Sequence, residues 1–232
     1  MAERTPLLLL PGLLCDARLW RDVVDGVSDL ATPQLADLTR DDSVGDMAER
    51  VLAAAPPRFA LAGLSMGGYV AFEILRRQPQ RVARLALLDT SAAPDPPTRA
   101  AQRRAGLALL ARGRFAGVTR QMLPRLVHPR HVDGPVGEAV RAMAERVGAD
   151  AYRRQQAAIL ARPDSRPLLA SIAVPTLVVV GADDAMTPPA ESHVLQRGIA
   201  GARLATIPDC GHLPPMEAPE TTCALLREWL RD

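Results

Sequence analysis

The motif that most specifically indicates a catalytic residue is a serine between glycines. The run Gly63–Gly68, with the letters GLSMGG, follows a short apolar stretch at Phe59–Ala62 and precedes an amphipathic helical stripe. A serine on a tight strand-to-helix turn is held in a strained backbone conformation, and the residues two before and two after it must be small. Gly63 and Gly67 meet that need. Ser65 is therefore the candidate nucleophile, and a glycine-rich helix cap is the alternative interpretation.

A serine hydroxyl is a weak nucleophile at neutral pH and needs a base within hydrogen-bond reach. Of the four histidines, His212 lies in a loop directly after the last predicted strand, where a side chain can hang over the edge of a sheet. His212 is therefore the candidate base. We expect His128 and His131 to be solvated residues of an arginine-rich segment, and His193 to lie on an exposed helix over residues 189–198.

An acidic residue must orient that base, and three aspartates follow predicted strands. Asp89 follows the strand at Leu85–Leu88, while Asp183 and Asp184 follow the strand at Thr176–Val180. The chain order nucleophile, acid, base favours the later pair. The candidate base follows Asp184 by 28 positions, which is enough for one helix and one strand back across the sheet. The remaining aspartates are expected to cap helices or begin turns.

The elements that must position these residues alternate along the chain. Short apolar runs bounded by turn residues recur, with helix-length amphipathic stretches between them, as in a parallel sheet covered by helices on both faces. The pattern predicts an α/β fold with a doubly wound, mostly parallel, six-stranded sheet. Its strands are predicted at Leu7–Leu10, Gln34–Asp37, Phe59–Ala62, Leu85–Leu88, Thr176–Val180 and Arg203–Ile207.

The alternation stops over residues 94–166, which predict a helical cap inserted into a core made of residues 1–93 and 167–232. This segment holds fourteen arginines against six acidic residues, a net charge of +8, although the whole chain carries only +2. Such a cap admits an anionic substrate or an acidic carrier protein. A solvated helical face in an arginine-biased chain is the alternative.

Bulk composition limits the remaining possibilities. With 232 residues and 48% hydrophobic content the chain has enough apolar sequence for one core, and its small net charge predicts neither a nucleic-acid nor a membrane partner. The apolar run at residues 7–14 is too short to span a bilayer and is broken by Pro11. Cys15, Cys210 and Cys223 lack metal-type spacing, so we expect free thiols and a cytoplasmic protein.

Three motifs together resemble the α/β-hydrolase superfamily over nearly the whole chain. Gly63–Gly68 is similar to its nucleophile elbow, Gly181–Pro189 to its acid loop and Gly211–Glu217 to its histidine loop. The family's aspartate is the third residue after the glycine of the acid loop, which matches Asp184. Within the superfamily the chain is most similar to small carboxylesterases, enol-lactonases and ring-cleavage-product hydrolases with a helical cap.

Two departures from that family pattern stand near the N-terminus. Pro11 precedes Gly12 where the family has histidine, so the oxyanion loop lacks its usual anchor. The chain also reaches its first buried strand at once, so the leading antiparallel strands of the family are expected to be missing.

The resemblance implies a serine hydrolase that needs no metal and no cofactor. His212 would take the proton of Ser65, Asp184 would hold the imidazole, and the backbone N–H groups of Leu13 and Met66 would receive the oxyanion of the acyl transfer. The expected substrate is a small, largely apolar carboxylic ester, lactone or thioester. Carbon–carbon bond hydrolysis, or another cofactor-free reaction that uses the same triad, is the alternative, followed by a ligand-binding protein on a hydrolase scaffold.

The expected substrate pocket is mostly apolar, because apolar residues flank the catalytic loops and recur at helical spacing in the predicted cap. These positions are Leu14, Trp20, Met122, Leu126, Met186 and Leu213.

Overall fold

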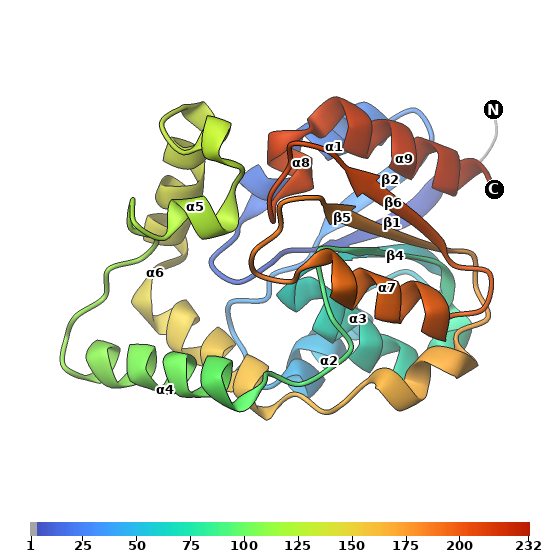
Figure 1. The fold of residues 1–232 in the computed structure, drawn as a ribbon. Helices are drawn as coiled ribbons and strands as arrows, with labels where there is room; N and C mark the ends of the chain where they lie inside the picture. The colour runs from blue at the N-terminus through green and yellow to red at the C-terminus, as the bar shows by residue number, and fades with distance from the viewer. Residues whose placement is uncertain (1–3) are drawn as a thin grey trace.

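A computed structural model describes residues 4–232, and its centre is one parallel sheet (Figure 1). Within these residues the strand order is β2-β1-β3-β4-β5-β6, and every neighbouring pair is parallel. The doubly wound α/β prediction is thereby confirmed. The strands are β1 (Thr5–Leu10), β2 (Ala31–Leu35), β3 (Phe59–Leu64), β4 (Val82–Leu88), β5 (Thr176–Gly181) and β6 (Arg203–Ile207).

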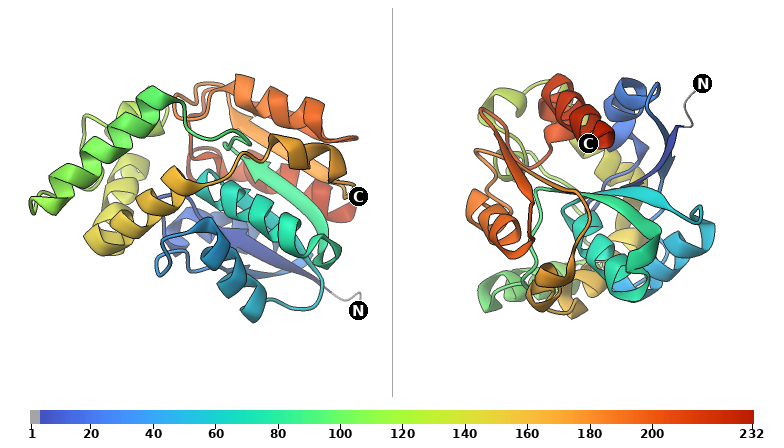
Figure 2. Two further views of the ribbon diagram at one scale, coloured as in Figure 1. Left: turned by 90° about the horizontal axis from the view of Figure 1, so that it is seen from below. Right: turned by 90° about the vertical axis from the view of Figure 1, so that its right-hand side faces the viewer.

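The two faces of the sheet carry separate helical layers (Figures 1 and 2). One face packs against α1 (Arg21–Val27) and α9 (Pro219–Arg231), and the other against α2 (Val44–Ala54), α3 (Met66–Arg77) and α7 (Pro189–Gly198). Because both faces are covered, every residue of β3 and of β5 is buried. This explains why these strands are continuous apolar runs in the sequence.

The second strand lies earlier in the chain than its predicted position at Gln34–Asp37. It pairs with β1 from Ala31 to Leu35 and includes Pro33, which cannot donate a ladder hydrogen bond. An edge strand tolerates that loss, and only Ala31 of β2 is fully buried. Because most residues of this edge strand are not buried, its sequence lacks the apolar run that would have marked where it begins.

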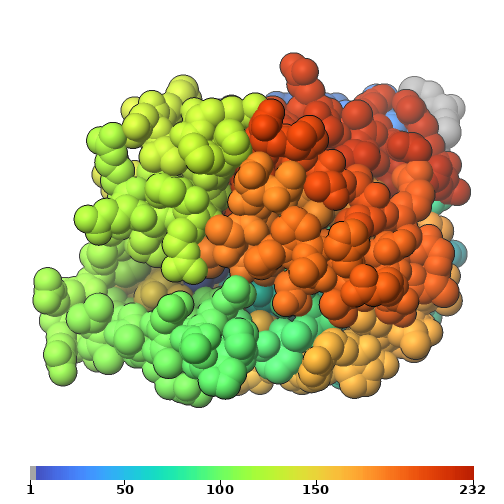
Figure 3. Space-filling model, in the orientation of Figure 1, coloured from blue at the N-terminus to red at the C-terminus, as the bar shows by residue number. Residues whose placement is uncertain are grey.

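Residues 94–166, the helical segment, connect β4 to β5. They contain α4 (Pro97–Ala111), the short α5 (Leu123–Leu126) and α6 (Pro135–Ala161), and α6 is kinked at Gly148, whose φ is 78°. These helices lie beyond the carboxyl ends of the strands (Figures 1 and 2), and their green and yellow atoms abut the orange atoms of the core (Figure 3).

The strand order reverses between β1 and β3, so the chain leaves these neighbouring strands towards opposite sides of the sheet. Such a switch point opens a crevice at the carboxyl edge, where ligands of open α/β sheets bind. The loops after β1, β3, β5 and β6 all emerge at this edge, and they carry the candidate residues. Within residues 4–232, none of the helices combines the length and apolarity needed to cross a membrane.

Candidate active site

Ser65 occupies the single residue between β3 and α3. Its φ of 52° and ψ of −113° form a strained conformation for a residue with a side chain. Two hydrogen bonds to the end of β4 and the loop after it hold Ser65: its N–H donates to the Leu88 carbonyl at 3.0 Å, and the Thr90 hydroxyl donates to its carbonyl at 2.8 Å. The serine is thereby fixed where the sheet opens towards solvent.

The two glycines of the motif are explained by close backbone contacts around this turn. A Cβ on Gly63 would lie 2.6 Å from the carbonyl carbon of Gly67, and a Cβ on Gly67 would overlap the carbonyl oxygen of Leu10 in β1. Both positions therefore require glycine, as the sequence predicted.

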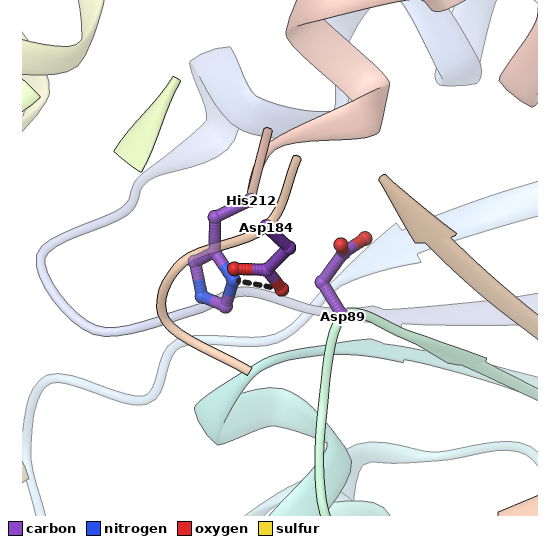
Figure 4. A group of neighbouring side chains, drawn as sticks. All are labelled: Asp89, Asp184 and His212. Carbon is purple, nitrogen blue, oxygen red and sulfur yellow. Dashed lines mark hydrogen bonds and ion pairs between the residues drawn. The ribbon is translucent and has the colours of Figure 1, made fainter. Parts of the chain in front are cut away.

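His212 and Asp184 form a buried hydrogen-bonded pair (Figure 4). The Nδ1 atom of His212 lies 2.8 Å from Oδ2 of Asp184. The Asp184 carboxylate also accepts the Met186 N–H at 2.7 Å, the Thr187 N–H at 3.0 Å and the Thr187 hydroxyl at 2.6 Å. Burial alone would raise the pKa of Asp184, but His212 and Thr187 outweigh burial and hold that pKa below its usual value. Asp184 is therefore a carboxylate at neutral pH.

The other two candidate aspartates lie differently. The Asp183 side chain is 50% exposed, and its nearest imidazole is that of His128, at 4.0 Å. Asp89 is fully buried beside Asp184 (Figure 4), and its Oδ1 accepts the Gly181 N–H at 2.9 Å. Within residues 4–232 its Oδ2 has no hydrogen-bond partner. Burial, followed by the charge of Asp184, raises the pKa of Asp89 well above its usual value.

The carboxylate of Glu217 shapes the loop that carries His212. This buried side chain accepts the N–H groups of Gly211 at 3.0 Å, Leu213 at 2.9 Å and His128 at 2.7 Å. In the sequence, Glu217 is only the last residue of the histidine-loop motif. An acidic residue inside an otherwise apolar, proline-rich stretch is the signal that points to such a role.

Two backbone N–H groups are available next to Ser65. Met66 is the first residue of α3, so its N–H has no partner inside the helix. Leu13 follows Gly12, where an added Cβ would lie 3.5 Å from Cβ of Ser65. Within residues 4–232 neither N–H donates to another protein group. Both predicted oxyanion donors therefore lie next to Ser65 and have no protein acceptor within the described residues.

Ser65 and His212 line the same cavity, whose volume is about 230 Å³. Its walls are mainly apolar and come from the oxyanion loop, the histidine loop and the helical segment. Five of the six predicted pocket residues are among its lining residues: Leu14, Met122, Leu126, Met186 and Leu213.

The prediction of Trp20 as a pocket residue was wrong. Trp20 ends a short 3₁₀ helix at Ala17–Trp20, which carries its indole away from the oxyanion loop and into the core between the sheet and α9. Its side chain is completely buried there. Proximity in sequence did not give proximity in space, because the chain turns between the two positions.

Cys15 also lines the cavity and is a second potential nucleophile. Burial, with a smaller contribution from Asp16, raises the pKa of this thiol to about 12. A thiol needs to ionise to be an effective nucleophile. The Cys15 thiol therefore stays protonated at neutral pH, and Ser65 remains the candidate nucleophile of the cavity. Like Cys15, the cysteines at Cys210 and Cys223 are free, as predicted.

Two clusters within residues 4–232 bring potential metal-ligand atoms within 4.8 Å of one another. The first consists of Asp89, Asp184 and His212, and the hydrogen bonds of Asp184 already use both of its carboxylate oxygens and Nδ1 of His212. The second joins His128 to the largely exposed Asp183 and Asp209 on the surface. The buried cluster is therefore arranged as an acid and imidazole pair.

Comparison with known proteins gives one family. A family model described as alpha/beta hydrolase fold matches residues 26–219 of this chain. The chain is also 32% identical over 183 residues to the pimeloyl-[acyl-carrier protein] methyl ester esterase of Neisseria meningitidis serogroup C / serotype 2a. That match covers 73% of this chain and 68% of the relative.

Solved structures agree with the sequence comparison. A thermophilic esterase from Thermogutta terrifontis is 32% identical with a TM-score of 0.88, over 98% of this chain and 89% of that one. The enol-lactonase from Burkholderia xenovorans LB400 is 24% identical with a TM-score of 0.84, over 100% of this chain and 93% of that one, and shares the fold.

Proposed function

This chain belongs to the alpha/beta hydrolase fold family as a hydrolase of the esterase type, and we propose that it cleaves carboxylic esters through an acyl-enzyme on Ser65. One observation carries the proposal: the strained serine and the imidazole of a buried histidine–carboxylate pair line the same cavity. Nucleophile, base and orienting acid are the parts that acyl transfer to serine requires.

In the first half of the reaction, His212 acts as the base. Asp184 binds the Nδ1 side of the ring, which leaves Nε2 to take the hydroxyl proton as the Ser65 oxygen attacks the carbonyl carbon. The carbonyl electron pair moves onto oxygen, where the N–H groups of Leu13 and Met66 receive it. Each such donor contributes about 3–4 kcal/mol of transition-state stabilisation in comparable sites.

The second half reverses the proton transfers. The protonated His212 gives its proton to the departing alcohol, and the acyl group remains on Ser65. Water then attacks the acyl carbon while His212 takes a proton from it. As the bond between the acyl carbon and the Ser65 oxygen breaks, His212 returns that proton to the serine oxygen and the acid product leaves. Every step uses groups of this chain and water.

The cavity walls support a small, largely apolar acyl group with one anionic end. Arg99, Arg103 and Arg125 line the cavity, and no acidic side chain from residues 4–232 does. Arg103 is occupied by Asp95 and by Gln156 at 2.9 Å, while Arg99 and Arg125 form no ion pair within the described part of the chain. A carboxylate or phosphate on the substrate would complement these two guanidinium groups.

A turnover panel tests the proposal. Purified wild-type protein and Ser65→Ala would be compared on short and long esters, lactones, thioesters and vinylogous diketones. We expect ester hydrolysis by the wild type and a loss of about a thousandfold or more in the variant. Turnover confined to the diketones would instead indicate carbon–carbon bond hydrolysis. No turnover of any class would favour a binding protein on this scaffold and overturn the proposal.

A further inference from the structure

One side chain of the helical segment reaches the loop that carries the oxyanion donor. Gln155 of α6 is completely buried, and its Oε1 accepts the N–H of Leu14 at 3.1 Å. Its Nε2 donates to the carbonyl of Leu38 at 3.1 Å. The amide therefore joins the loops that follow β1 and β2, and both of its ends are satisfied.

The oxyanion loop needs such a tether. Leu14 has a φ of 59°, an unfavourable value for a residue with a side chain. Pro11, which precedes Gly12, has no N–H to anchor the loop, and the local turn is closed by the Cys15 N–H donating to the Gly12 carbonyl at 3.2 Å. Gln155 supplies the contact from outside the loop that this conformation needs.

The position of that contact matters for catalysis, because Leu14 is the next residue after the proposed donor Leu13. The two N–H groups belong to consecutive peptide units, so fixing the Leu14 peptide restricts the rotation of the Leu13 peptide. An oxyanion hole is effective only when its donors are held in place before the charge develops.

We propose that Gln155 is a positioning residue of the oxyanion hole, holding Leu14 so that the neighbouring Leu13 N–H is fixed towards the reacting carbonyl. This inference rests on the proposed function. It also links two parts of the molecule, since neighbouring residues of α6 line the substrate cavity. The helix that bounds the substrate thereby also organises the groups that stabilise its transition state.

The decisive variants separate the two hydrogen bonds of Gln155. Gln155→Met keeps the length of the side chain and removes both bonds, while Gln155→Glu keeps an acceptor for Leu14 and, when ionised, loses the donor to Leu38. Arg154→Met is the matched control, because Arg154 of the same turn donates to the Thr39 carbonyl at 2.8 Å and, within residues 4–232, forms no hydrogen bond to the oxyanion loop.

For a small activated ester, we expect Gln155→Met to lower kcat by about tenfold to a hundredfold with KM within about threefold of wild type. The Ki of a trifluoromethyl ketone, which forms a tetrahedral adduct on serine, should rise by the same factor as kcat/KM falls. Gln155→Glu should stay within about fivefold of wild type, and Arg154→Met should match the wild type.

The inference is overturned if Gln155→Met keeps wild-type kcat, if its loss lies only in KM, or if Arg154→Met loses as much. Circular dichroism and thermal melting establish folding. If Gln155→Met does not fold, Gln155→Ala removes the same acceptor, and the same loss is expected. Absence of Ser65-dependent turnover in the wild type would refute the proposed function itself, which is a separate outcome.

Discussion

Asp89 and Asp184 are two buried carboxyl groups side by side, and their surroundings shift their pKa values in opposite directions. Asp184 accepts three donors from its own loop and one from His212, which stabilise its charge. Asp89 accepts one N–H and faces the charge of Asp184, which favours its protonated form. The orienting carboxylate of the proposed triad is therefore Asp184.

Replacing Asp184 by asparagine should cripple turnover, while Asp183→Asn should behave like the wild type. An asparagine at 184 favours the wrong tautomer of His212, and a comparable change in a related mechanism lowers kcat by about ten-thousandfold. Steady-state ester hydrolysis measures both variants, and thermal melting checks that each is folded. Similar kcat values for the two variants would mean that the acid is misplaced.

Asp89→Asn should keep the fold and the activity, and its stability relative to wild type should increase with pH. A carboxyl whose pKa is raised in the folded state contributes stability below its unfolded pKa of about 3.9 and loses that contribution as pH rises. Asparagine carries no titrating proton, so it avoids a loss of at most about 1.4 kcal/mol per pH unit.

Urea unfolding of Asp89→Asn and wild type at pH 5, 6, 7 and 8 measures this difference. A stability difference that stays constant over this range would show that Asp89 is ionised in the folded protein.

At this scale the sequence predicted Ser65, Asp184 and His212, because chain order and local motifs encode them. It did not predict the raised pKa of Asp89, because that depends on burial and on the charge of Asp184, which lies 95 positions later in the chain. The role of Gln155 also escaped prediction, since its partners come from two other loops. The prediction of Trp20 as a pocket residue was wrong for a similar reason, because its place depends on how the chain turns in space.

The elements of the core were easier to predict than their edges. The runs that became β3 and β5 are apolar throughout because both faces of the sheet are covered, and β6 was predicted with its observed bounds. The edge strand β2 has one buried residue, and its predicted start was three residues too late in the chain. A hydrophobic pattern appears in the sequence only where residues are buried, and an edge strand has too few buried residues to show one.

Met122, at the start of α5, lies between solvent and cavity. Its side chain is 45% exposed and also lines the cavity. We expect Met122→Ala to shift preference towards bulkier acyl groups, while single-turnover acylation by a small activated ester stays within about tenfold. Leu109→Ala is the control, because Leu109 is 46% exposed and is not a lining residue. Equal shifts in both variants would refute a lid role for this part of the helical segment.

Charge is distributed unevenly over the whole molecule. The helical segment carries fourteen arginines against six acidic residues, so the remainder of the chain carries a net charge of −6. Many of these arginines have partners in the molecule, such as Asp16 for Arg146 and Asp95 for Arg162. Eight of the fourteen form no ion pair within residues 4–232, and of these eight only Arg99 and Arg125 line the cavity.

Arg99→Gln combined with Arg125→Gln should raise KM about tenfold for the monomethyl ester of a dicarboxylic acid, through the loss of a charge-assisted hydrogen bond. The neutral dimethyl ester should be unaffected, and added salt should weaken only the wild-type preference. Arg120→Gln is the control, because Arg120 pairs with Asp133 away from the cavity. Equal effects on both esters would contradict recognition of an anionic group.

The proposed mechanism requires Ser65 to be the residue that becomes acylated. Incubation with a fluorophosphonate, followed by intact-mass measurement and peptide mapping, tests it directly. We expect a single adduct on Ser65, none on the folded Ser65→Ala variant, and labelling of His212→Ala slowed by at least about a hundredfold, because the base is missing. An adduct on another residue, or unchanged labelling of Ser65→Ala, would contradict it.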